Sequence, residues 1–269
     1  MSIAIEEIHN ELLVLLEFFH KICVQNGINY SLHGGTLLGA IREKGFIAWD
    51  DDADVTMDRK NYDKFCQLMN ETELPDEFAF VDEGRFPQFA MKREGHPVVW
   101  TDIFVYDFIS ENKLLQKIKM AGTRFFILTT RSLEDQKMSN MNGLYKGMNK
   151  VLMNLLVHGS QIIPFKTRIK HAKRFMKSFP GNRKYVHRSN DTRVGSSMII
   201  PASINDQYET IDFLGKELMI ISDYDTLLRS SYGSNYMTPK KDKPDKMHAI
   251  TLKKEQDEIE SFVVKRKVT

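Results

Sequence analysis

A run of aspartates at positions 50–54, interrupted by a single alanine, lies shortly after a glycine pair at positions 34–35. Neighbouring carboxylates repel one another by about 1 kcal/mol per pair even in water at about 4 Å. From the middle of the run onward, acidic and apolar residues alternate, which is the period of a half-buried β-strand. Such a strand places Asp50, Asp52 and Asp54 on one side, with the remaining aspartate turned the other way. The run therefore predicts a strand that bears a one-sided row of carboxylates.

A third acidic position and the glycine pair suggest what the carboxylates bind. Asp102 is the one acid within the apolar stretch Val98–Val105 of a later predicted strand. Carboxylates spaced i, i+2 on one strand, joined by one from an adjacent strand, can hold two divalent cations that neutralise a phosphate. Backbone N–H groups where a glycine-rich turn enters a helix can hold phosphate oxygens. The pattern predicts a site for phosphate and Mg²⁺, with two ions expected and Mn²⁺ as an alternative.

Composition limits the class of protein. The chain has 269 residues, 42% of them hydrophobic and 28% charged, with a net charge of +2, so its overall charge gives no reason to expect a nucleic-acid partner. Two cysteines, Cys23 and Cys66, offer neither a disulfide framework nor a zinc cluster. The acidic N-terminal residues do not resemble a signal peptide, and no apolar run approaches the ~18 residues of a membrane span. We expect a cytoplasmic protein.

Hydrophobic periodicity predicts a mixed order of helices and strands. Apolar residues at helical spacing mark the N-terminal segment, and short alternating runs mark the strands. A β-meander follows the third helix, so the fold class expected is α+β, a mixed-sheet core flanked by helices with a helical insert. The predicted helices are 3–26, 36–43, 59–70, most of 112–176 and 224–231, and the predicted strands are 29–33, the aspartate strand, 78–82, 88–92, 97–108, 194–200 and 209–213.

This order predicts three parts: a catalytic core over 1–111, a helical and partly basic insert over 112–190, and a C-terminal part over 191–269 that completes the cleft. Residues 166–188 contain nine Lys or Arg and no Asp or Glu. A basic run of this kind is most often a solvated helix face. The alternative is contact with an anionic membrane at its inner face, where each cation contributes on the order of 1 kcal/mol.

The motifs together resemble those of a known family. The order of the glycine pair, an apolar–Asp–apolar–Asp strand and a distant third Asp looks like the nucleotidyltransferase superfamily, apart from Asp51, which stands where an apolar residue is usual. The segments 34–42 and 44–55 resemble the LicD family of phosphocholine transferases almost residue by residue. Further matches are residues 59–65, 102–104 and the segment Tyr-Gly-x-x-Tyr-Met-Thr-Pro at 232–239. The fukutin-related proteins share this core.

The resemblance implies an enzyme and assigns its residues. It implies transfer of phosphocholine from CDP-choline to a hydroxyl of a cell-surface glycan or its lipid-linked precursor, with release of CMP. Asp52 and Asp54 would bind both metal ions, Asp50 would assist, and Asp102 would complete the metal site and act as general base. The residues expected to bind substrate are His33, Gly34, Gly35, Thr36, Arg42, Trp49, Trp100, Tyr106, Tyr236 and Pro239.

Several alternatives stay open at this point. The donor can instead be CDP-ribitol, CDP-glycerol or CDP-ethanolamine, and a non-catalytic scaffold for glycan assembly is a further possibility, although every expected metal carboxylate and both glycines are present. A quaternary ammonium group favours an aromatic wall, for which Trp49, Trp100, Tyr106 and Phe46 are candidates. Trp residues are more often core anchors. His248 is a further candidate site residue, with an ordinary surface position as the alternative.

Overall fold

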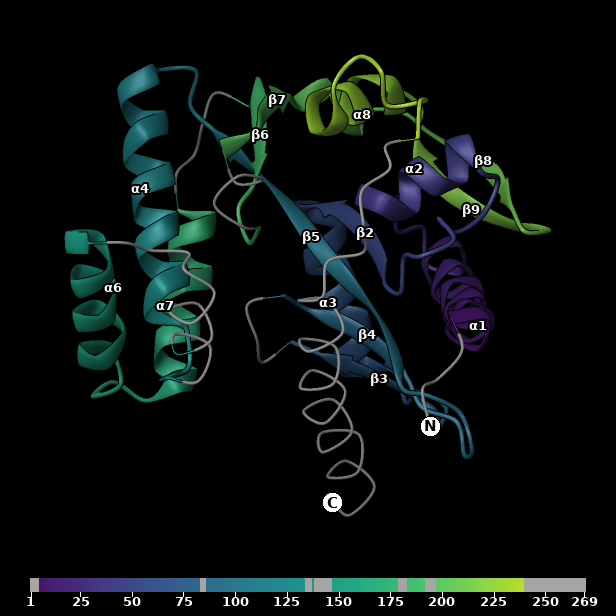
Figure 1. Cartoon of the computed structure of the whole chain (residues 1–269), viewed down its shortest axis with the longest axis horizontal. Coiled ribbons are helices and arrows are strands. Elements are labelled where there is room, and N and C mark those ends of the chain that lie inside the picture. The colour runs from purple at the N-terminus through teal and green to yellow at the C-terminus, as the bar shows by residue number, and fades with distance from the viewer. Residues whose placement is uncertain are drawn as a thin grey trace. The chain divides into compact units, whose positions relative to one another are not determined.

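A computed structural model describes residues 5–82, 86–133, 137, 147–178, 183–191 and 197–239. His248 lies outside these residues. The chain divides into two compact units, one made of Met1–Asp82, Phe86–Tyr106 and Ser203–Thr269, the other of Glu83–Arg85 and Asp107–Ala202. Both helices and sheets are present, which confirms the predicted α+β class (Figure 1). The three-part division expected from the sequence stays a prediction.

The first unit contains most of a mixed β-sheet. Its strands are β1 (Ser31–Leu32), β2 (Ala53–Asp58), β3 (Phe78–Val81), β4 (Gln88–Met91) and β5 (Val99–Ile109), and they lie in the order β1-β2-β5-β4-β3. β2 and β5 pair in parallel, whereas the other pairs within this path are antiparallel. Strands distant in sequence thus become neighbours at the centre of the sheet, and each side chain on β2 lies beside one on β5.

Among its described residues, the first unit also contains four α-helices and a hairpin. The helices are α1 (Ile5–Gln25), α2 (Gly34–Arg42), α3 (Arg59–Glu71) and α8 (Tyr224–Tyr232); η2 (Ala202–Asn205) is a short 3₁₀ turn, and β8 (Tyr208–Phe213) pairs with β9 (Lys216–Ile221). Asp58 caps α3 by accepting a hydrogen bond from the Asn61 N–H. The predicted ranges of α1, α3 and α8 agree with these bounds to within two residues. β9 was not predicted.

An aromatic cluster forms the core of this unit. The Phe19 ring on α1 lies 5.1 Å from Tyr30, 5.3 Å from Phe65 and 5.5 Å from Phe89, measured between ring centroids. All four residues are completely buried. Each contributes on the order of 1.5–3 kcal/mol by burial, and offset or edge-on ring pairs add to this. The cluster holds α1 and α3 against the sheet and so fixes the strands that carry the acidic residues.

Three helices and two strands make up the described part of the second unit. The helices are α4 (Lys113–Thr129), α6 (Gly147–Ser160) and α7 (Phe165–Lys177); β6 (Tyr185–Arg188) pairs with β7 (Ile199–Pro201). The Lys119 ammonium is completely buried and donates to the carbonyls of Phe175 and Met176 at the end of α7. The C-terminal end of a helix carries negative partial charge, so a buried cation at these carbonyls joins α4 to α7.

The basic run at 166–188 is not one solvated helix face. α7 ends at Lys177, and the run continues into β6. Arg168 is buried and donates to the carbonyls of Thr129 and Ile163, so its charge serves packing within the unit. Arg188 is buried beside Asp191 at 2.9 Å. Exposed cations of the run are therefore concentrated on α7.

Candidate active site

The sequence predicted that the glycine pair forms a turn before a helix. In the structure, both glycines belong instead to the first turn of α2. His33 is the N-cap residue, with an extended backbone and no capping hydrogen bond from its side chain. Gly34 has φ +55, a value that glycine adopts without the steric cost paid by other residues. The helix can begin this early because both residues lack a Cβ, which brings its N-terminal N–H groups close to the acidic segment.

Two carboxylates lie against these glycines. A Cβ placed on Gly34 would meet Asp54 Oδ2 at 2.8 Å, and one on Gly35 would meet Asp50 Oδ2 at 2.3 Å. Negative charge is stabilised at a helix N-terminus, where N–H groups lack intrahelical partners. A side chain at either glycine would thus displace an acidic side chain, and the N-terminus of α2 and the aspartate run lie against each other.

Backbone hydrogen bonds fix α2 to β2 at Asp54. The Asp54 N–H donates to Thr36 Oγ1 at 2.9 Å, and the His33 N–H donates to the Asp54 carbonyl at 2.8 Å. The His33 ring is buried 5.0 Å from the ring of Phe104. Both neighbours of the glycine pair therefore hold the strand in place, and the contact of Thr36 and His33 with a donor phosphate stays a prediction.

Asp54 and Asp102 are register partners on parallel strands β2 and β5. Paired residues of neighbouring strands project to the same face of a sheet, and the strands lie about 4.8 Å apart. Gln88, the partner of Asp102 on β4, donates its amide to Asp102 Oδ1 at 2.8 Å. Two acidic side chains from sequence positions far apart are thus neighbours on one face, and one of them is oriented by an amide.

Asp50 and Asp52 precede the strand rather than lying on it, which corrects the predicted row of three on one strand. β2 begins at Ala53, where pairing with β5 begins, so the residues before it lie outside the strand. His9 Nε2 lies 2.6 Å from the Asp50 carbonyl, and its ring stacks on Phe46. The loop places the Asp50 carboxylate beside Gly35.

The donor set suits magnesium in its chemistry. Among the described residues, no group of three or more acidic, His or Cys side chains is placed to hold a metal ion by itself. Mg²⁺ prefers oxygen ligands and is usually held by one or two carboxylates together with water and substrate phosphates. Asp54 and Asp102 supply such a pair, and Asp52 is two residues from the first of them. The residues present therefore fit an ion that is completed by a bound diphosphate.

Some predicted substrate residues do not join this cluster. Arg42 ends α2, about 13 Å from the glycine end of a nine-residue helix, and its Nε lies 2.6 Å from Glu43 Oε1. Tyr236 is buried, and its hydroxyl donates to Asp225 Oδ1 at 2.7 Å; burial, and then this bond, raises the pKa of Tyr236. Pro239 is exposed. Binding of substrate by these three residues stays a prediction.

The predicted aromatic residues differ in burial. Trp100 is buried in a small apolar cluster with Ala79, Ala90 and Val98, so it packs as a core residue. Tyr106 is also buried, and it lies four residues, about 13 Å, beyond Asp102 along β5. Trp49 is 50% exposed and directly precedes Asp50. Of the three, only Trp49 combines an accessible ring with a place beside the acidic cluster.

Sequence reasoning missed two residues of this neighbourhood. Gln88 orients Asp102, and His9 holds the loop through Asp50. Gln88 opens a strand that was predicted, but its role depends on strand order, which no local pattern reveals. His9 lies on an amphipathic helix, where a polar residue at the edge of the apolar stripe is ordinary.

Comparison with known proteins agrees with the geometry. Residues 27–145 match the family model described as LicD/FKTN/FKRP, nucleotidyltransferase domain. The matched part of the chain, which is under half of its length, is similar to the LicD family. It contains the α2 N-terminus, the aspartate run and Asp102, so the LicD-family match includes every residue of the cluster described above.

Individual relatives match over shorter stretches. The lipopolysaccharide cholinephosphotransferase LicD of Haemophilus influenzae is 55% identical over 56 residues, which is 21% of each chain. An uncharacterised protein of Rickettsia typhi is 36% identical over 55 residues, 20% of this chain and 18% of the relative. An uncharacterised protein of Rickettsia prowazekii is 44% identical over 41 residues, 15% of each. The matches thus span about a fifth or less of the curated relatives.

Proposed function

We propose that the chain transfers phosphocholine from CDP-choline to a hydroxyl group of a lipopolysaccharide-type glycan and releases CMP. The observation that carries this proposal is the placement of Asp54 opposite Asp102, in parallel register, beside the glycine-rich N-terminus of α2. The family match over 27–145 and the cholinephosphotransferase relative support the same reaction class.

Each residue of the cluster has a part in this proposal. Asp54 and Asp102, with Asp52 before the strand, would hold Mg²⁺, which when bound would neutralise the donor diphosphate and activate the attacking hydroxyl. The N–H groups of Gly34 and Gly35 would bind phosphate oxygens at the start of α2. Asp102, held by Gln88, would accept the proton of the acceptor hydroxyl as that oxygen attacks the phosphorus bearing choline. The bond from that phosphorus to CMP then breaks, and the electron pair leaves with CMP.

Choline recognition is the part of the proposal that concerns Trp49. A quaternary ammonium group cannot accept a hydrogen bond, but it is attracted to the face of an aromatic ring. Trp49 offers a half-exposed indole next to Asp50, whose carboxylate reaches Gly35. A polyol such as ribitol gains little from an aromatic face, so an accessible indole favours choline among the CDP-linked donors.

A donor panel tests the proposal. The full chain is incubated with Mg²⁺, a lipopolysaccharide acceptor and CDP-choline, CDP-ribitol, CDP-glycerol or CDP-ethanolamine, and CMP release is measured. We expect CMP from CDP-choline in the presence of both metal and acceptor, and Trp49→Ala should weaken binding of CDP-choline more than that of CDP. Release from another donor would replace choline in the proposal. No CMP from any donor with any divalent metal would contradict transferase activity.

A further inference from the structure

An apolar stripe on α6 faces solvent. Met148, Val151, Leu152 and Leu155 follow the i, i+3, i+4, i+7 spacing of one helix face, yet each is at least half exposed. The loop after the helix continues the apolar surface with Ile162, which is 88% exposed. Monomeric proteins seldom leave a contiguous apolar face of this kind in water, and such faces mark contact with proteins or membranes.

The charge of the same unit indicates which of these it meets. The three helices carry four Lys or Arg in α4, one in α6 and six in α7, eleven in all, and no Asp or Glu. On α7, the exposed residues Lys166, Lys170, Arg174 and Lys177 recur every three or four positions and so share one face. Helices with this composition attract an anionic surface, and each cation near such a surface strengthens binding.

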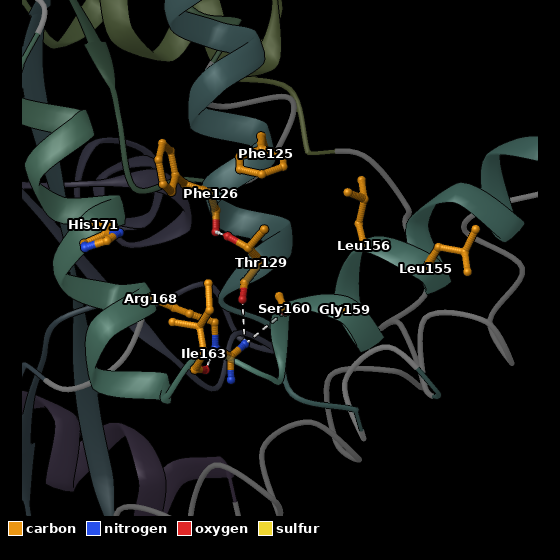
Figure 2. A pocket seen from close by; sticks show the side chains of 10 residues that line it. All are labelled: Phe125, Phe126, Thr129, Leu155, Leu156, Gly159, Ser160, Ile163, Arg168 and His171. Atoms are coloured by element: carbon orange, nitrogen blue, oxygen red, sulfur yellow. Dashed lines mark hydrogen bonds between the residues drawn. The ribbon is translucent and has the colours of Figure 1, made fainter.

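A pocket connects the stripe to the basic helix. It encloses about 360 Å³, and its lining includes Phe125 of α4, Leu155 and Leu156 of α6, and His171 of α7. Figure 2 shows these side chains around one opening, with Arg168 engaged by hydrogen bonds at its edge. Leu155 belongs to both the stripe and the pocket, and Lys170 directly precedes His171. Apolar surface and positive charge are therefore contiguous.

We propose that the helical unit binds the surface of an anionic lipid bilayer, with the α6 stripe among the acyl chains and the α7 cations at the headgroups. An amphipathic helix beside Lys and Arg lies in the membrane interface without crossing it. In the described part of the chain, no helix is long and apolar enough to span a membrane. A nucleic acid would also attract the cations, but it would leave exposed Met, Val, Leu and Ile without a partner.

Sedimentation with vesicles tests the inference, using phosphatidylcholine vesicles with and without phosphatidylglycerol at low and high salt. We expect the full chain to bind the anionic vesicles, and high salt to weaken the binding by screening the cations. The measurement needs no donor, metal or acceptor, so its outcome is independent of the proposed transferase activity. Failure to bind anionic vesicles at low salt would overturn the inference.

The apolar contribution has a matched control. Val151 on α6 is 54% exposed, and Val24 on α1 of the other unit is 51% exposed. Val151→Glu should weaken vesicle binding by about fivefold or more, because it places an acid where acyl chains and anionic headgroups are expected. Val24→Glu should leave binding within about twofold of the unsubstituted chain. Equal loss in both variants would overturn the proposed face.

The contribution of the α7 cations to vesicle binding is tested by two double variants. Lys170→Glu with Arg174→Glu should reduce binding by at least about 25-fold, since each cation near the surface contributes about fivefold. Lys21→Glu with Lys60→Glu is the control. It changes the net charge by the same amount at exposed positions of the other unit and should weaken vesicle binding less. A dimer in solution that Val151→Glu converts to monomer, without loss of vesicle binding, would assign the stripe to a second copy and contradict the proposal.

Discussion

The two units carry opposite charge patterns for different uses. In the first unit, four aspartates crowd one short segment, and two of their carboxylates lie against the start of α2. In the second, three helices carry eleven cations and no acids. The acids are held at fixed positions by strand register and by glycine contacts, whereas the α7 cations lie at the surface. On the two proposals above, the first unit would carry the chemistry and the second would bind the membrane surface.

Removing a carboxylate should produce the largest effect and should be confined to the first unit. Asp54→Asn or Asp102→Asn should lower the rate of CMP release by about 10³-fold, the scale of losing one preorganised electrostatic group. Vesicle binding should not change. Asp212→Asn, an exposed acid on β8, is the control and should retain activity. Loss of vesicle binding along with activity would show that the two units do not act separately.

The second-largest effect is expected from substituting alanine for a helical glycine, which should lower activity in the first unit but not in the second. A Cβ on Gly35 would meet Asp50 Oδ2 at 2.3 Å, whereas one on Gly159 of α6 meets nothing within 4 Å. Gly35→Ala should lower activity by about 10- to 100-fold through displacement of the acidic loop. Gly159→Ala should keep activity and raise helix stability by about 0.5–1 kcal/mol. Activity assays and urea unfolding measure both, and full activity of Gly35→Ala would remove that contact from the site.

Buried Lys119 distinguishes a structural cation from those at the surface. Lys119→Met removes a buried donor from the carbonyls of Phe175 and Met176 at the end of α7, at a cost of about 2 kcal/mol. Exposed Lys117 on the same helix provides the control, since Lys117→Met breaks no buried bond. Hydrogen exchange at the end of α7 should increase for the first variant alone. Equal exchange in both would mean that the ammonium does not secure the helix.

The smallest effect concerns pH and belongs to the first unit. Burial lowers the pKa of His20 below its usual 6.5, against an opposing effect of Glu217, so the folded state binds the proton less readily than the unfolded chain. Stability is fully present above pH 6.5 and falls as the pH drops through the window below it. His20→Gln should flatten the dependence of Tm on pH in that window, and an unchanged slope would exclude His20 as its source.

Local patterns predicted much of the first unit. Alternation predicted β2 and β5, and helical spacing predicted α1, α3 and α8, because each of these buries one regular face. The pairing of Asp54 with Asp102 could not be predicted in the same way. It depends on β5 inserting between β2 and β4, and strand order is decided by packing of the whole sheet. The start of α2 also differed from the prediction. Both glycines enter the helix because neither has a Cβ that would collide with the neighbouring acidic side chains.

In the second unit, the sequence pattern of an element does not predict whether its side chains are buried. The stripe on α6 has the spacing of a buried face but is exposed, since periodicity reports amphipathicity and not what covers the apolar side. β6 was missed because its sequence, Tyr-Val-His-Arg, continues a basic run, and its Arg188 is buried by pairing with Asp191. Trp100 likewise could not be assigned to core or ligand wall until its neighbours were known.

Electron paramagnetic resonance of Mn²⁺ tests the central claim most directly, since Mn²⁺ can replace Mg²⁺ at oxygen ligands. The full chain and Asp102→Asn are titrated with Mn²⁺ in the presence of CDP-choline. We predict that the full chain removes free Mn²⁺ from solution when CDP-choline is present, and that Asp102→Asn binds it at least about tenfold more weakly. Equal binding by the two proteins would contradict a metal site shared by Asp54 and Asp102.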